Sequence, residues 1–177
     1  MGRRLPTWLT EAERKRLLGL EISHRDRAIL ILFLYSGLRC NELRMLDVPD
    51  LDFDEMTVLV RFAKRSKQRV VPLHAEAAAA LTEYLEGRTS GPMFFSERKQ
   101  RLSLRRLRSL IKELGQQAGL RKDLHPHALR HSFAVALLEK DVDLETIRDL
   151  LGHEDIKTTS IYLHCSTAKR RAAVDRI

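Results

Sequence analysis

Apolar residues in the first quarter of the chain recur with the spacing expected of helices. Thr10, followed by Glu13 three residues later, forms a capping-box pattern that predicts the start of the first helix. The next segment is strongly apolar and stops at Gly37, which predicts a buried helix. The helices expected in this quarter span residues 10–20, 24–36 and 41–46.

The pattern then changes from helical spacing to short alternating runs. Residues 57–62 alternate and are rich in β-branched side chains, and residues 69–73 form a similar run, so a β-hairpin is expected with 64–68 as its polar turn. Residues 93–95 are expected to add a third short strand. Helical patterns are found over 74–86, 103–117, 126–140, 144–151 and 156–162. This order predicts an α+β fold, a mainly helical single domain with a small antiparallel sheet.

Length and charge narrow the class of protein. A chain of 177 residues fits one domain, which we expect over 10–166, with a linker or tail over 1–9 and a C-terminal helix or tail over 167–177. The formal net charge of +8 and the pI of about 9.9 favour a polyanionic partner, most often nucleic acid, although many basic proteins bind none. An aromatic content of 6% is low for a surface that stacks single-stranded bases.

Cysteine usage and the length of the apolar runs indicate the cellular compartment of the protein. Cys40 and Cys165 are far apart and form no CxxC pair, which argues against a disulfide scaffold and against a cysteine zinc site. The sequence begins with no apolar signal run, and its longest apolar stretch, 28–35, is too short to span a bilayer. We therefore expect free thiols, a cytoplasmic protein and no membrane partner.

Several segments carry groups suited to a phosphodiester. Such an anion gains charge density when attacked, so its chemistry needs fixed cations, a nucleophile and a proton donor for the leaving oxygen. Arg39 follows Gly37, and Glu42 lies one helical turn later, where it could hold the arginine by an ion pair. A surface arginine with a local partner is the alternative interpretation.

A histidine-rich segment offers a second set of candidate groups. His127 and Arg130 are three residues apart and share a helix face. His127 and His131 have the spacing of a zinc helix, but Ala128 stands where the HExxH pattern needs glutamate, so no metal site is expected. A metal-dependent hydrolase built on this pair is the alternative. Taken singly, His153 is typical of a helix C-terminus and Tyr162 of a packed tyrosine.

Together these elements resemble the tyrosine recombinase (phage integrase) family, including its Xer-like members. The order is Gly-Leu-Arg-x-x-Glu-Leu, a hairpin lysine, His-x-Leu-Arg-His, Leu-Gly-His and then Tyr, and it covers about residues 5–167. Five spaced elements in this order are far more specific than any one of them. The resemblance implies that the catalytic residues are Arg39, Lys64, His127, Arg130, His153 and Tyr162, with Glu42 supporting Arg39. Ala63 and Arg65 replace glycines common beside the hairpin lysine, which makes Lys67 a rival for that role.

The resemblance also implies a reaction, site-specific recombination of double-stranded DNA. Tyr162 would attack phosphorus, expel a 5′-hydroxyl and form a 3′-phosphotyrosine that a second strand resolves. The two arginines and His153 would stabilise the transition state, Lys64 would protonate the leaving oxygen, and His127 would accept the tyrosine proton. The bond energy is kept in the phosphotyrosine, so neither metal, ATP nor another cofactor is expected. Topoisomerase-like nicking and religation, or a regulator that kept only the fold, are alternatives.

Family members usually carry an amino-terminal domain that clamps the duplex, and here the match begins almost at residue one. We therefore expect a catalytic domain without its clamp, either excised or natural, which is a monomer alone and a homo-tetramer on two DNA sites. Residues 98–108 hold six Lys/Arg and no Asp/Glu. This run is either a plain solvated face or a phosphate-contacting surface. The residues expected to contact DNA are Lys67, Arg98, Lys99, Arg101, Arg105, Arg106 and Arg108.

Overall fold

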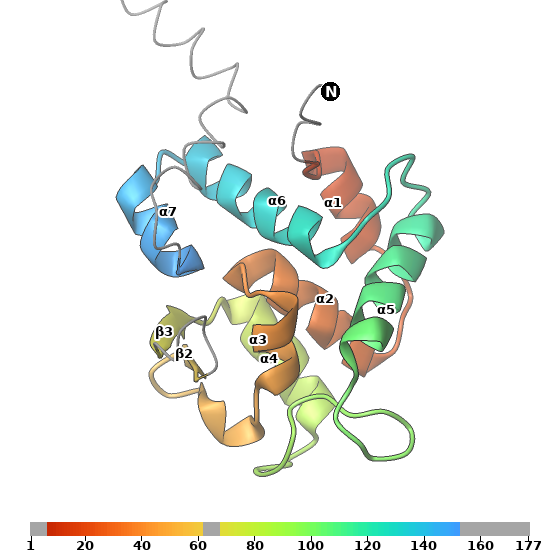
Figure 1. The fold of residues 1–177 in the computed structure, drawn as a ribbon, viewed down its shortest axis with the longest axis vertical. Coiled ribbons are helices and arrows are strands. Elements are labelled where there is room, and N and C mark those ends of the chain that lie inside the picture. The colour runs from red at the N-terminus through yellow and green to blue at the C-terminus, as the bar shows by residue number, and fades with distance from the viewer. Residues whose placement is uncertain (1–6, 62–67, 153–177) are drawn as a thin grey trace, which may run out of the picture.

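The computed structural model of the chain describes residues 7–61 and 68–152 (Figure 1). The body is mainly helical and the small sheet lies at one edge of it, which confirms the predicted α+β class. The elements, in chain order, are α1 (Glu11–Leu18), α2 (His24–Ser36), α3 (Cys40–Met45), the 3-10 helix η1 (Val48–Asp50), β1 (Leu51–Asp52), β2 (Thr57–Val60), β3 (Arg69–Pro72), α4 (Ala75–Leu85), α5 (Leu104–Gln117), α6 (Pro126–Glu139) and α7 (Leu144–Leu151). The helix expected over 156–162 lies outside the described residues.

Helix α2 is the centre of the fold, as its apolar sequence predicts. Ile29, Leu32 and Phe33 are completely buried, and the helix packs against α4 on one side and α6 on the other. A helix that is apolar on every side is stable only when other elements cover it all round. Burial of each such side chain stabilises the fold by about 1.5–3 kcal/mol, so α2 forms a rigid base for the segments that follow it.

The sheet is antiparallel with strand order β1-β2-β3. The expected hairpin strands are present, and Val58 of β2 pairs with Val71 of β3. Val58, Val60 and Val71 are almost fully buried, so the alternating sequence places one face of the hairpin on the core. The sheet therefore pairs Val60 and Arg69, which lie on either side of residues 62–67 in the chain.

The third strand is Leu51–Asp52, so the prediction of a strand over 93–95 is wrong. Met93 and Phe94 are both buried, which does not fit the alternation of a strand with one solvated face. The Arg88 guanidinium also donates hydrogen bonds to the carbonyl oxygens of Pro92 and Met93, at 2.6 Å each. The segment instead makes isolated bridges to neighbouring loops.

Helix α7 is attached to the body through a second, smaller apolar cluster. Ile147 and Leu151 of α7 are fully buried against Ala134, Val135 and Leu138 of α6. The helix ends at Gly152, whose φ of 62° is left-handed, as the Leu-Gly sequence predicts. This packing fixes the position of the last carbonyl groups of α7.

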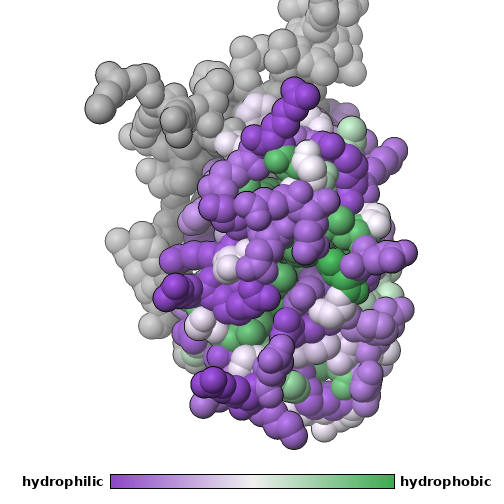
Figure 2. Space-filling model, turned by 90° about the vertical axis from the view of Figure 1, so that its right-hand side faces the viewer, coloured by the Kyte–Doolittle hydropathy of each residue, from purple (hydrophilic) through white to green (hydrophobic). Residues whose placement is uncertain are grey.

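The surface on the side where α5 lies is mostly hydrophilic, with apolar residues in small separate patches (Figure 2). Within residues 7–61 and 68–152, no helix combines the length and apolar character needed to cross a membrane.

Candidate active site

The turn between α2 and α3 presents Arg39. Gly37 ends α2 with a left-handed φ of 61°, and Leu38 is fully buried, so the chain reverses over an apolar anchor. Arg39 then precedes α3 with an extended backbone. Each residue of the Gly-Leu-Arg sequence thus has its own role in the turn: Gly37 reverses the chain, Leu38 anchors it in the core, and Arg39 precedes α3.

Two contacts orient the Arg39 side chain. Its Nη1 donates to Glu42 Oε1 at 2.7 Å, which is the ion pair expected from the spacing, and its Nη2 donates to the carbonyl of Gly152 at 2.9 Å. These bonds use two of the five guanidinium N–H donors. The Arg39 side chain is 28% exposed, so part of the guanidinium group remains accessible to solvent.

Glu42 is a buried carboxylate that is shared by two arginines. Oε1 accepts from Arg39 and from Arg69 Nη1, while Oε2 accepts from Arg69 Nη2 and from the Arg39 backbone N–H. Burial alone would raise the pKa of Glu42, but the hydrogen bonds and charges of these arginines outweigh it and lower the pKa to about 2. Glu42 is therefore ionised at neutral and mildly acidic pH.

Among the predicted catalytic residues that the structure describes, Arg130 is the most buried. It lies on α6, is 4% exposed, and donates to the carbonyls of Gly37 and Leu151 at 2.6 Å each. It thereby joins the end of α2 to the end of α7. The Gly37 and Gly152 carbonyls thus hold Arg130 and Arg39 at the same pair of helix ends.

His127 is exposed to solvent in the first turn of α6. Partial burial lowers its pKa, and so do the nearby charges of His125, Arg130, Arg39 and Arg108. Its imidazole is therefore neutral at neutral pH, which is the form that can accept a proton.

His131, which was not expected to be catalytic, lies further into the fold. Burial, followed by the charges of His127, Arg130 and His125, lowers the pKa of His131 to about 4. His125 caps α6 by accepting the backbone N–H of Ala128 at 3.1 Å. In the described part of the chain, no three side chains of His, Cys, Asp or Glu are grouped closely enough to hold a metal ion.

The basic run divides into cations with internal partners and cations without a described one. Arg101 donates to the carbonyls of Arg44 and Leu46 and to the Asp47 carboxylate, which ties its loop to the end of α3. Arg106 pairs with Glu113 along α5. The exposed members of the run that have no ion pair within residues 7–61 and 68–152 are Arg98, Lys99, Arg105 and Arg108.

Arg108 has a position of particular interest on α5. Its charge lowers the pKa of His127 and opposes the effect of burial, which raises the pKa of the Cys40 thiol. Helix α5 also packs against α3, which follows Arg39. Arg108 and the start of α3 therefore belong to neighbouring elements.

Four predicted residues, Lys64, Lys67, His153 and Tyr162, lie outside the described residues. The chain positions on either side of them are nevertheless informative. The 62–67 segment that holds both lysines is flanked by Arg61 and Arg69, which bind the buried carboxylates of Asp50 and Glu42. His153 is the residue that directly follows Gly152, whose carbonyl binds Arg39.

Sequence reasoning missed Arg69, which it treated only as the start of a strand. The partner of Arg69 is 27 residues away in sequence, so no local pattern reveals it. A signal was present, however. Arg69 alternates in phase with the buried Val71 of β3, and a charged residue at an inward-facing strand position requires a buried partner.

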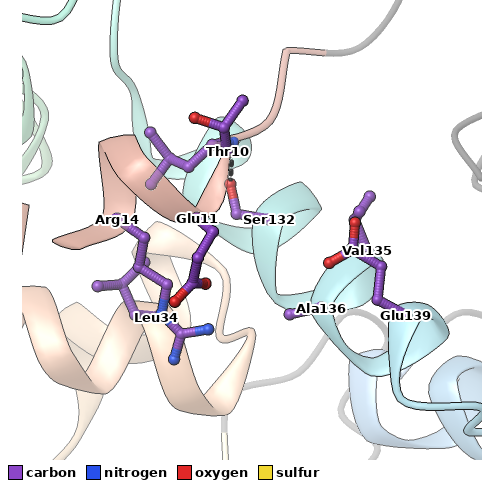
Figure 3. A pocket seen from close by; sticks show the side chains of 9 residues that line it. Thr10, Glu11, Arg14, Leu34, Ser132, Val135, Ala136 and Glu139 are labelled. Atoms are coloured by element: carbon purple, nitrogen blue, oxygen red, sulfur yellow. Dashed lines mark hydrogen bonds between the residues drawn. The ribbon is translucent and has the colours of Figure 1, made fainter.

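A pocket lies apart from this site, between the start of α1, helix α2 and helix α6 (Figure 3). Its lining residues are Leu9, Thr10, Glu11, Arg14, Leu34, Ser132, Val135, Ala136 and Glu139. The Leu9 backbone N–H donates to Ser132 Oγ at 2.8 Å beside it, which fixes the entry of the chain into α1. None of the residues predicted to be catalytic lines this pocket.

Comparison of sequences with known proteins gives concordant matches. A model of the phage integrase family matches residues 7–169. Tyrosine recombinase XerA of Pyrococcus horikoshii is 37% identical over 177 residues, which cover 97% of this chain and 61% of that protein. Tyrosine recombinase XerC of Pseudomonas fluorescens is 40% identical over 183 residues, which cover 98% of this chain and 61% of that protein.

Comparison with solved structures agrees. The crystal structure of XerA recombinase has a TM-score of 0.88 at 32% identity, covering 99% of this chain and 65% of that chain. The XerH site-specific recombinase in a post-cleavage complex with its palindromic difH substrate has a TM-score of 0.84 at 27% identity. The match covers 97% of this chain and 53% of that chain. The chain thus spans less than two thirds of the length of these proteins. Because the family model matches nearly all of its residues, this chain belongs to the phage integrase family, as its motifs predict.

Proposed function

We propose that this chain is the catalytic domain of a site-specific tyrosine recombinase that cuts and rejoins double-stranded DNA without metal or ATP. The observation that carries the proposal is the meeting of Arg39 and Arg130 at the ends of α2 and α7, with His127 one helical turn before Arg130 on α6. Such a group offers fixed positive charge and a proton acceptor, which are the requirements of attack on a phosphodiester. The solved XerH complex with its difH substrate supports the choice of substrate.

In the proposed reaction, the Tyr162 oxygen forms a bond to phosphorus while the bond from phosphorus to the 5′ oxygen breaks. The tyrosine proton passes to His127, whose lowered pKa keeps it neutral and ready to accept it. Lys64 supplies a proton to the departing 5′ oxygen. Arg39 and Arg130 hold the phosphate oxygens, with His153 beside them, and stabilise the added charge of the transition state. Reversal with another 5′-hydroxyl then rejoins the strands.

Covalent trapping tests this proposal directly. Supercoiled plasmid is incubated with the parent chain or Tyr162→Phe in EDTA, denatured with detergent, and examined for a protein–DNA adduct. We expect an adduct in the parent alone, a free 5′-hydroxyl that polynucleotide kinase can label, and a blocked 3′ end. An adduct at the 5′ end, or cleavage that EDTA abolishes, would contradict the mechanism and favour a metal-dependent hydrolase.

The products distinguish recombination from the related activities. Exchange of strands between two labelled duplexes indicates a recombinase, while a change of linking number alone indicates topoisomerase-like nicking and religation. DNA binding without an adduct, on every duplex tried, indicates a regulator. We also propose a cytoplasmic monomer that forms a tetramer on two DNA sites, which sedimentation with and without duplex DNA tests.

A further inference from the structure

We propose that Arg69 is a positioning residue for the reaction, acting on the phosphate-binding Arg39 through their shared partner Glu42. The inference rests on the proposed function, because it assigns Arg39 to the phosphate. Arg69 belongs to the strand β3 that follows the lysine-bearing segment, whereas Arg39 belongs to the turn between α2 and α3. The role would therefore link the two parts of the site through a single carboxylate.

The geometry of the Arg69–Glu42 contact is that of a two-point clamp. Arg69 Nη1 and Nη2 bind Glu42 Oε1 and Oε2 at 2.9 and 2.8 Å, and the two side chains are only 13% and 2% exposed. A bidentate pair fixes the plane of the carboxylate, not merely its distance. Because Glu42 Oε1 also receives Arg39 Nη1, the plane set by Arg69 determines where the Arg39 guanidinium lies.

The charges support the same role. A buried Glu42 with Arg39 as its only cation would cancel the positive charge that a phosphate needs. Arg69 adds a second cation to the same carboxylate, so the group of three keeps a net positive charge. Both Nη groups of Arg69 bind Glu42, and its Nε–H has no acceptor among the described residues.

The end of α7 is in contact with the same arginine. A Cβ atom built on Gly152 would lie 3.1 Å from Arg69 Cζ, so Arg69 fills the space between Glu42 and the end of α7. Arg39 binds the carbonyl of that same Gly152. Arg69 thus touches both partners of Arg39, the carboxylate and the helix end.

Arg61 provides a matched control for Arg69. It lies on the other side of the same 62–67 segment and pairs with a carboxylate that is equally buried, since Asp50 is 4% and Glu42 3% exposed. Asp50 makes no described bond to Arg39; its other oxygen accepts the backbone N–H of Asp47. Arg61→Met and Arg69→Met therefore both remove a guanidinium from a buried carboxylate, but only the second one disturbs the partner of Arg39.

The experiment compares Arg69→Met, Arg69→Lys and Arg61→Met with the parent chain. Thermal unfolding measures the structural effect, fluorescence anisotropy measures affinity for duplex DNA, and the rate of adduct formation is measured with DNA at saturation. We expect Arg69→Met to slow adduct formation by roughly 30-fold or more while changing the affinity less than about 3-fold. Arg69→Lys recovers part of the rate, because lysine restores the positive charge but cannot bind both carboxylate oxygens as the planar guanidinium does. Arg61→Met lowers the melting temperature comparably but slows the adduct less than about 3-fold.

A second measurement does not require activity. In the free parent chain, NMR of the arginine side chains should show resolved Nη signals for Arg39, because its bonds to Glu42 and Gly152 slow rotation of the guanidinium. In Arg69→Met these signals should merge, and in Arg61→Met they should persist. Unchanged Arg39 signals in Arg69→Met, or equal rate losses in the two Met variants, overturn the inference. Failure of the parent to form any Tyr162-dependent adduct counts against the proposed function instead, and the NMR result still decides the role of Arg69.

Discussion

The Arg39 guanidinium donates a hydrogen bond of 2.9 Å to the carbonyl oxygen of Gly152, 113 residues further along the chain. The preceding carbonyl, that of Leu151, accepts from Arg130. The last carbonyls of a helix lack partners within it and carry partial negative charge, so cations stabilise them. The two arginines proposed to bind phosphate therefore cap α7 in the free protein, and the residue that follows this cap is His153.

Three glycines should differ in their tolerance of alanine. All three have left-handed φ angles, but a new Cβ would meet nothing at Gly87, would lie 3.1 Å from Arg69 at Gly152, and 2.5 Å from Phe133 at Gly37. We expect alanine to lower the free energy of unfolding by about 1 kcal/mol at Gly87, about 2 at Gly152 and about 3 or more at Gly37. Urea denaturation measures the series. Equal losses at the first two positions would show that Arg69 moves aside easily.

Glu42→Gln should destabilise the protein in a way that depends on pH. The pKa of Glu42 in the folded state, about 2, lies below its ordinary value of 4.5. The carboxylate therefore contributes stability that is fully present above about pH 4.5 and is lost as the pH falls towards 2. At pH 7 we expect the variant to lose about 3 kcal/mol in the free energy of unfolding, and this difference should shrink in acid.

Glu113→Gln is the matched control for that prediction. Glu113 pairs with Arg106 on the exposed face of α5, where water screens the interaction. Its substitution should change the free energy of unfolding by about 0.5 kcal/mol or less. A difference between Glu42→Gln and the parent that stays constant from pH 7 to pH 3 would contradict the buried ion triad.

His131 should make the protein less stable in mild acid. Its pKa in the folded state is lowered from 6.5 to about 4, so between these values the unfolded chain binds more protons than the folded one. The stability due to neutral His131 is therefore complete above pH 6.5 and is lost as the pH falls towards 4. We expect His131→Gln to flatten the decline of unfolding free energy over this window by up to about 3 kcal/mol. His24→Gln, at an exposed position, serves as the control, and an equal flattening there would refute the assignment.

Much of the fold could be predicted because its elements have strong local causes. The apolar run of α2, the caps at Thr10 and Gly37, and the alternation in β2 each specify an element within a few residues. The segment at 93–95 was predicted wrongly because its apolar residues pack on other elements, such as Tyr84 of α4, and not within a sheet. Arg88 takes the carbonyls that a strand would use, and a contact of that kind leaves no periodic trace.

The site was predictable in part for a different reason. Arg39 with Glu42 is a local pair, so the spacing alone indicated the ion pair that the structure contains. The contacts of Arg130 with Gly37 and of Arg69 with Glu42 span 93 and 27 residues and depend on how α6 and the hairpin pack on α2 and α3. Long-range contacts of this kind follow from tertiary packing, which the order of motifs implies only through resemblance to a family.

Substitutions of Arg101 and Arg105 should distinguish the structural arginines of the basic run from those that contact phosphate. The Arg101 side chain is 24% exposed and donates hydrogen bonds to two carbonyls and to the Asp47 carboxylate. Arg105, by contrast, is exposed on α5. Arg101→Gln should lower the free energy of unfolding by about 2 kcal/mol, because it removes a charge-assisted pair with Asp47 and two hydrogen bonds that hold the loop to the end of α3. Arg105→Gln should leave stability within about 0.5 kcal/mol and reduce the slope of log affinity for duplex DNA against log salt by about 0.9, the value for one phosphate contact.

The salt series is what makes this contrast decisive. Fluorescence anisotropy with a fixed duplex between low and moderate salt gives the slope for each variant, and urea denaturation gives the stability. If Arg101→Gln lowers the slope by about 0.9 as well, Arg101 contacts phosphate despite its internal bonds, and its loop must rearrange on DNA. If neither variant changes the slope, the basic face of α5 is a solvated surface, and the duplex contacts the arginine site from another direction.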